Sequence, residues 1–273
     1  MNAFLPFLGW LVVLGYALSF AGYVSYFRAK RSRTAAWTRK ALLTSVLVHT
    51  GYLALLTREM GHLPVGDLFK VLTATSWFFV VVYLILEMRL KEVTMGVFFL
   101  PLVTVLQVIS NLFIDLEKPL APVLTDVLFE VHVALTISAY AAFSISFISS
   151  VMYILLSREI QSKKLGIFFE RLPSLQFFED LNNHAVNIGL ILVSAGILLG
   201  VYMGINVWEG AWALDPKPLA VVITWCIYFA LFVGRKSVGW QGRRSAIVSV
   251  IAYNWLLFSF LVVSIFFSKF HSF

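Results

Sequence analysis

Eight long apolar runs restrict what this chain can fold into. They cover residues 3–27, 41–57, 71–88, 94–114, 127–156, 185–206, 219–234 and 246–268. Most of them approach the roughly 20 residues that a helix needs to cross a bilayer. Because 60% of the 273 residues are apolar and only 13% are charged, one soluble core could not bury them, which excludes a soluble enzyme. The sequence predicts an all-α, polytopic membrane protein with about eight transmembrane helices in a single domain, residues 1–273.

The lysines and arginines alternate between the loops, and this alternation predicts the orientation of the spans. Sixteen of the 21 basic residues fall in the loops after spans one, three, five and seven. Short loops rich in Lys and Arg stay in the cytoplasm. We therefore expect both termini outside and a multi-pass protein in the inner (cytoplasmic) membrane of the cell. The net charge of +7 then reflects basic loops beside the lipid bilayer, and no nucleic acid is expected as a partner.

Two further patterns concern how the helices pack. Gly196, Gly200 and Gly204 form two overlapping Gly-x-x-x-Gly steps in the sixth span, a spacing that favours close contact between membrane helices. The segment between spans five and six mixes charged and aromatic residues. Its composition predicts an amphipathic stretch on the membrane surface over about 157–183.

Three of the five histidines are candidates for binding chemistry. The topology places His132 near the outer end of span five and His271 just beyond the outer end of span eight. Two imidazoles at a similar depth could bind a metal or ligate a haem iron on both faces, or they could be two unrelated interfacial histidines. His49 lies inside span two, about 12 Å along the helix from its cytoplasmic start. It is a ligand or relay, or a neutral imidazole hydrogen-bonded to a neighbouring helix, and both interpretations stay open.

A tryptophan-rich loop follows span six on the same outer side. Trp208 and Trp212 are four residues apart, so they share a face on a helical turn. Tryptophan is common at membrane interfaces as an anchor, but here the pair leads directly into Asp215, Pro216 and Lys217. Indole faces can stack on a flat apolar macrocycle, and a lysine can meet its propionates.

This loop resembles the signature Trp-Gly-x-x-Trp-x-Trp-Asp-Pro-Lys-Glu of the haem-handling membrane proteins of cytochrome c assembly. The matching positions are Trp208, Trp212, Asp215, Pro216 and Lys217. The sequence around His132 is similar to the histidine helix that precedes the signature in that family. The closing Phe-His-Ser-Phe, which contains His271, resembles the family's Leu-His-Ser-Tyr ending. The resemblance covers nearly the whole chain, and its motifs occur in the same order.

The resemblance implies an outward-facing platform for transiently bound haem b. It implies that His132 and His271 are the axial ligands of the haem iron, and that the tryptophan loop with Asp215 and Lys217 holds the macrocycle. It also implies work with a partner membrane subunit that carries a large extracytoplasmic domain, and delivery of haem to apocytochrome c. The chain would then be a subunit of a cytochrome c synthase, since it has no self-contained catalytic motif.

The chain departs from the family pattern at four positions. Glu209 replaces the glycine, Leu214 the third tryptophan, Pro218 the final glutamate and Val233 a histidine in the following helix. These changes favour a second function, that of a membrane regulator of haem synthesis acting on the level of glutamyl-tRNA reductase. A secondary transporter is a third candidate, ranked low because the spans show no evident inverted repeat.

The topology yields a prediction that single cysteine replacements can test. Positions Ala36 and Ser162 should face the cytoplasm, while Lys118 and Ser272 should face out, because Lys and Arg mark the inner loops. An impermeant thiol reagent added to intact cells should label cysteines at the second pair and not at the first. Labelling of Ser162→Cys from outside would overturn this orientation.

Overall fold

The computed structural model describes residues 4–29, 32–65, 67–115, 126–163, 166–207 and 215–259, and within these ranges all regular structure is helical. The helices are α1 (Phe4–Ala29), α2 (Ser32–Met60), α3 (Leu68–Leu90), α4 (Gly96–Phe113), α5 (Val127–Gln161), α6 (Ile167–Arg171), α7 (Leu175–Val207), α8 (Pro216–Ser237) and α9 (Arg243–Phe258). Seven of the described helices are long and apolar enough to cross a membrane. The prediction of an all-α, polytopic membrane protein is therefore confirmed.

The predicted surface segment differs from the helices that form, and the eighth predicted span, 246–268, is described only in part. Residues 246–259 belong to α9 and its C-cap Ser259, and the rest of the span lies outside the described residues. The surface segment 157–183 is shorter than predicted, because α5 continues to Gln161 and α7 begins at Leu175. At about 1.5 Å per residue, the 33 residues of α7 are about 50 Å long. The roughly 30 Å hydrocarbon layer cannot contain them, so polar early turns continue the helix beyond it.

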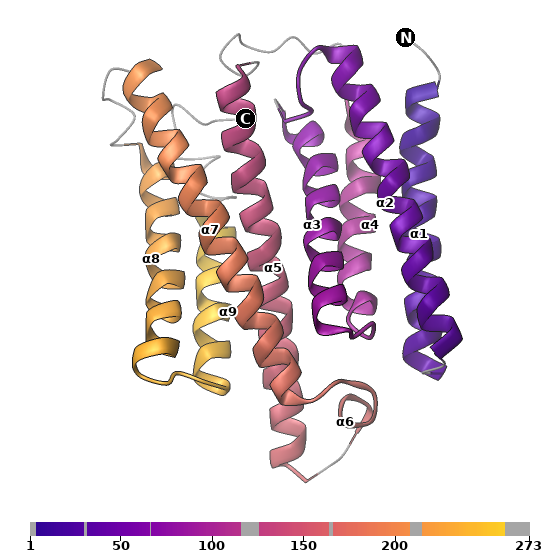
Figure 1. The fold of residues 1–273 in the computed structure, drawn as a ribbon, viewed down its shortest axis with the longest axis vertical. Coiled ribbons are helices and arrows are strands. Elements are labelled where there is room, and N and C mark those ends of the chain that lie inside the picture. The colour runs from indigo at the N-terminus through magenta and orange to yellow at the C-terminus, as the bar shows by residue number, and fades with distance from the viewer. Residues whose placement is uncertain are drawn as a thin grey trace. The chain divides into compact units, whose positions relative to one another are not determined.

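The chain divides into two compact units, Met1–Glu130 and Val131–Phe273. In the first unit, α1 packs against α2 and α4, and α3 packs against α4 and α2 (Figure 1). A buried carboxylate joins three of these helices near one end. Glu87 of α3 accepts hydrogen bonds from the hydroxyls of Tyr23 (2.5 Å) and Tyr83 (2.7 Å), and Arg39 of α2 donates its Nε–H to it at 2.8 Å. The pairing offsets the cost of burying the charge of Glu87.

The second unit has one apolar core to which α5, α7, α8 and α9 all contribute. At its centre the rings of Phe143 and Tyr228 stack with centroids 3.8 Å apart and planes 5° apart. Gly189 of α7 allows this stack, because an added Cβ would lie 2.4 Å from the Phe143 ring. Helix α7 crosses the other helices of the unit at a slant (Figure 1).

A buried amide near the polar start of α7 links three helices of the same unit by hydrogen bonds. Asn182 Oδ1 accepts hydrogen bonds from Ser146 of α5 (2.6 Å) and Ser249 of α9 (3.0 Å), and its Nδ2 donates to Ser245 of α9 at 3.4 Å. One side chain thereby joins three helices. Because buried polar groups need hydrogen-bonding partners, such links fix which helices are neighbours.

The packing of this core can be tested with two leucines of opposite exposure. The side chain of Leu231 is fully buried, whereas Leu198 is 72% exposed on the surface of α7. Leu231→Ala should lower the free energy of unfolding by about 2–3 kcal/mol, because it leaves a cavity among packed side chains. Leu198→Ala, the same chemical change, should cost well under about 1 kcal/mol. Denaturant unfolding in detergent micelles, followed by circular dichroism, measures both, and equal costs would contradict the assignment of this core.

Candidate functional site

The imidazole of His132 is held in one orientation in the second turn of α5. Its Nδ1 lies 2.9 Å from the backbone oxygen of Gly196 in α7. A carbonyl oxygen only accepts, so Nδ1 must carry the proton and donate it. The other ring nitrogen, Nε2, then keeps its lone pair. A neutral imidazole of this tautomer, with Nδ1–H bonded to a carbonyl, is the usual form of a histidine that ligates a metal through Nε2.

Gly200 provides the space in which the His132 ring lies. A Cβ built on Gly200 would lie 2.7 Å from Cε1 of His132 and 3.0 Å from its Nδ1. One turn earlier, a Cβ on Gly196 would lie 3.0 Å from the hydroxyl oxygen of Thr136. The predicted close packing along the glycine steps is confirmed at these two positions, where α7 approaches α5. The Gly-x-x-x-Gly pattern predicts that α7 approaches another helix closely, but it does not predict that the space at Gly200 is occupied by the imidazole of His132.

Asp215 and Lys217 have a structural role at the start of α8. Asp215 is buried, and its Oδ1 accepts a hydrogen bond from the backbone N–H of Lys217 at 3.0 Å. Asp215 is therefore the N-cap of the helix, and Pro216 occupies the first helical position, where its missing N–H and fixed φ are favourable. The cap sets where the first turn of α8, which contains Lys217, begins. The structure thus brings His132, Asp215 and Lys217 to one end of the second unit.

Three predicted site residues, Trp208, Trp212 and His271, lie outside the described residues. Their roles stay predictions. Within the described ranges no group of three or more His, Cys, Asp or Glu side chains could hold a metal ion. A pair of axial histidines needs no such group, because a macrocycle supplies the other four ligands of its iron.

His49 lies in the first unit and uses both of its ring nitrogens. Its Nδ1 lies 2.8 Å from the hydroxyl of Tyr16 in α1, and its Nε2 lies 3.0 Å from the hydroxyl of Thr73 in α3. Thr73 donates its own proton to Oε1 of Gln107 in α4 at 2.9 Å. Thr73 must therefore accept from Nε2–H of His49, and Tyr16 must donate to Nδ1. The chain of hydrogen bonds joins all four helices of the unit.

This arrangement matches one of the two interpretations of His49, a neutral imidazole bonded to neighbouring helices. Ligation of iron by His49 would require one of its two hydrogen bonds to open. Sequence reasoning identified the histidine but missed its partners Tyr16, Thr73 and Gln107. A signal was present, since Thr73 and Gln107 are polar residues inside apolar spans, where such groups need partners.

Comparisons with known proteins agree in one family. The family model described as "Cytochrome C assembly protein" matches residues 65–271. The chain is similar to "Cytochrome c biogenesis protein CcsA" of Mesostigma viride, with 25% identity over 79% of this chain and 78% of the relative. It is similar to the protein of the same name from Chlorella vulgaris, with 24% identity over 79% of this chain and 78% of the relative. It is also similar to the protein of that name from Synechococcus sp. (strain WH7803), with 22% identity over 91% of this chain and 88% of the relative.

The space around His132 can be tested with matched glycine replacements. Gly200→Ala should lower the free energy of unfolding by about 1–3 kcal/mol, because the new methyl group overlaps the imidazole. Gly51→Ala is the control. It lies in α2 with nothing within 4 Å of its added Cβ, so alanine should be neutral or stabilising there. Detergent-solubilised variants can be compared by denaturant unfolding.

A double-mutant cycle identifies the neighbour responsible. In a His132→Ala background the methyl group of Gly200→Ala meets no imidazole, so most of its cost should disappear. If the cost is the same in both backgrounds, His132 does not occupy this space.

Proposed function

The chain belongs to the cytochrome c assembly protein family, and from this premise we propose that it handles haem during the assembly of c-type cytochromes. The family match covers residues 65–271, which include His132, the tryptophan loop and His271. Relatives carrying the name cytochrome c biogenesis protein cover most of the chain, which supports the same role. The observation that carries the proposal is the tautomer of His132, whose Nε2 lone pair is kept for a ligand.

In this proposal His132 is an axial ligand of the iron of transiently bound haem b. Haem supplies a ferric or ferrous centre with two open axial positions. The Gly196 carbonyl holds Nδ1–H, which orients the ring and raises the basicity of Nε2. Gly200 leaves the ring room to adopt that orientation. His132 as a whole is partly exposed, and in this proposal the macrocycle reaches Nε2 from the exposed side.

The remaining site residues are assigned by the family signature. We propose His271 as the second axial ligand, and Trp208 with Trp212 as stacking surfaces for the macrocycle. We propose that Lys217 meets a propionate, since α8 and the helix of His132 both begin at the same end of the second unit (Figure 1). Asp215 acts through its cap, which fixes the first turn of α8 and with it the position of Lys217.

The location and partners of the site follow from the same proposal. The basic loops place the His132 end outside, so haem is presented on the extracytoplasmic face of the inner membrane. The described residues include no large extracytoplasmic domain that could hold a protein substrate. We therefore infer a partner membrane subunit with such a domain, which brings apocytochrome c to the haem.

A regulator of haem synthesis is the second candidate, and Val233 is the observation that favours it. Synthases of this family carry a histidine at that position, whereas Val233 cannot ligate iron and is exposed on α8. A deletion strain separates the two functions. Loss of an assembly factor should lower c-type cytochromes at an unchanged level of glutamyl-tRNA reductase. Loss of the regulator should raise that enzyme while c-type cytochromes persist.

The axial assignment predicts that the purified protein carries six-coordinate haem, at least at part occupancy. His132→Ala and His271→Ala should each lose haem or shift its Soret band, because each removes one axial nitrogen. Added imidazole should restore part of the spectrum by filling the vacated position.

His184→Ala is the matched control for these two variants. Its Nδ1 also donates to a backbone oxygen, that of Asp180 at 2.7 Å, but it lies near the opposite end of the second unit, in the early turns of α7. Its spectrum should equal that of the parent protein. Unchanged spectra in both His132→Ala and His271→Ala would eliminate the axial assignment.

A further inference from the structure

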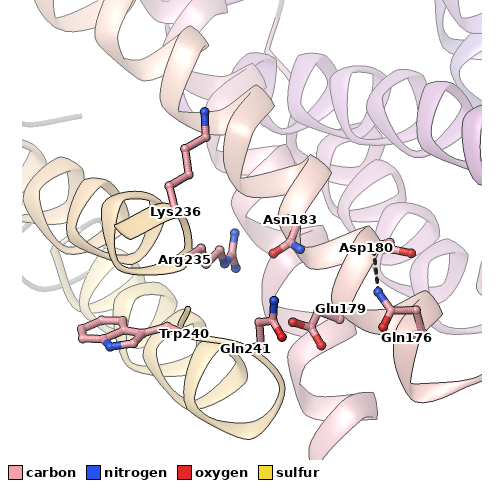
Figure 2. A pocket seen from close by; sticks show the side chains of 8 residues that line it. All are labelled: Gln176, Glu179, Asp180, Asn183, Arg235, Lys236, Trp240 and Gln241. Atoms are coloured by element: carbon pink, nitrogen blue, oxygen red, sulfur yellow. Dashed lines mark hydrogen bonds between the residues drawn. The ribbon is translucent and has the colours of Figure 1, made fainter. Parts of the chain in front are cut away.

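A second polar site lies in the second unit, away from His132. A pocket of about 320 Å³ opens between the early turns of α7, the last turn of α8 and the 238–242 loop (Figure 2). Four side chains converge on it, Glu179 and Asn183 from α7, Arg235 from α8 and Gln241 from the loop. The volume is at the lower end of the range of small-molecule sites.

Two buried polar atoms at this pocket have no partner among the described residues. Arg235 donates from Nε and Nη2 to the hydroxyl of Ser245, at 3.0 and 2.8 Å, but its Nη1 makes no hydrogen bond. Oδ1 of Asn183 is likewise buried without a partner. Buried polar atoms are nearly always bonded, so a donor and an acceptor left open beside one cavity require explanation. They indicate a ligand that offers both an acceptor and a donor.

Glu179 adds an unpaired negative charge to the same pocket. Within the described part of the chain it makes no hydrogen bond and no ion pair within 4.0 Å. Its carboxylate points toward the side chain of Gln241 (Figure 2). The adjacent Asp180 differs, because its Oδ1 accepts from Gln176 at 3.0 Å. Among the described residues the pocket therefore brings together a cation, Arg235, and an anion, Glu179, which act on each other electrostatically but form no direct ion pair within 4.0 Å.

The pocket lies at the depth of lipid head groups. The 33-residue α7 is too long for the hydrocarbon layer, and its early turns carry the polar residues. Helix α8 ends in Arg235 and Lys236, which belong to a loop predicted to face the cytoplasm. The pocket thus opens where a bilayer presents its phosphates and amines.

We propose that this pocket binds the head group of a phospholipid that carries both a phosphate and a primary ammonium. The phosphate accepts from Nη1 of Arg235, and the ammonium donates to Oδ1 of Asn183 and pairs with Glu179. A purely anionic head group would meet the repulsion of Glu179. A trimethylated head group has no N–H for Asn183. The phosphoethanolamine head group satisfies all three open groups at once.

Native mass spectrometry of the full-length protein in detergent can test this with dioctanoyl lipids. Dioctanoyl phosphatidylethanolamine should bind about tenfold more tightly than the phosphatidylcholine or phosphatidylglycerol of equal chain length, since it alone makes the charged hydrogen bonds on both sides. Soluble O-phosphoethanolamine should bind far more weakly, because it lacks the chains that lie along the helices. If soluble O-phosphoethanolamine binds as tightly as dioctanoyl phosphatidylethanolamine, the assignment of the pocket to a membrane lipid is overturned.

Variants assign the preference to the pocket. Glu179→Gln keeps the bonds of Arg235 to Ser245, and it should reduce the preference for phosphatidylethanolamine over phosphatidylcholine, because the charge that pairs with the ammonium is lost while Asn183 remains. Arg235→Gln should weaken binding of both. The control is Arg244→Gln, which removes the same charge from an exposed arginine at the start of α9 that does not line the pocket.

Two results would overturn the proposal. One is equal binding of the three lipids by the parent protein, which would assign the open groups to ordered water. The other is a preference for phosphatidylethanolamine that is undiminished in Glu179→Gln. Haem content should be the same in all these variants, so failure here is distinguishable from failure of the haem site.

Discussion

A polar side chain that is buried among helices must find its partner inside the protein, and both units are held together by this requirement. The first unit meets it with the chain from Tyr16 through His49 and Thr73 to Gln107. The second meets it with Asn182 and the serines around it. Apolar contacts alone are weakly selective in a membrane, because lipid tails are as apolar as leucine. The polar links therefore specify which helices are neighbours.

The same requirement governs the proposed haem site. His132 meets it with Nδ1 only, through Gly196, and so keeps Nε2 for another partner. His49 meets it with both nitrogens and has no free lone pair in this arrangement. Two histidines in membrane helices thus have different chemical capacities, and the difference comes from the number of protein partners that each one has.

The Asp-Pro-Lys segment illustrates how one motif can carry a structural and a functional role. Asp215 caps α8 and Pro216 begins it, which by itself would account for two of the three residues. Lys217 needs the cap to emerge at a defined place. Loss of Asp215 would therefore disturb the site even if its carboxylate never touches the macrocycle.

The class of fold and most of the helices follow from the amino-acid pattern alone, because a run of about 20 apolar residues in a bilayer has few alternatives to a helix. The same pattern also identified His132, His49 and the glycine steps. Only the packing of the helices decides three other features. They are the tautomer of His132, the hydrogen bonds to both ring nitrogens of His49, and the pocket at Arg235. Each depends on a contact between residues far apart in the chain, 64 positions for His132 and Gly196 and 33 for Tyr16 and His49. Helix packing brings those residues together, and no local pattern records which side chains will meet.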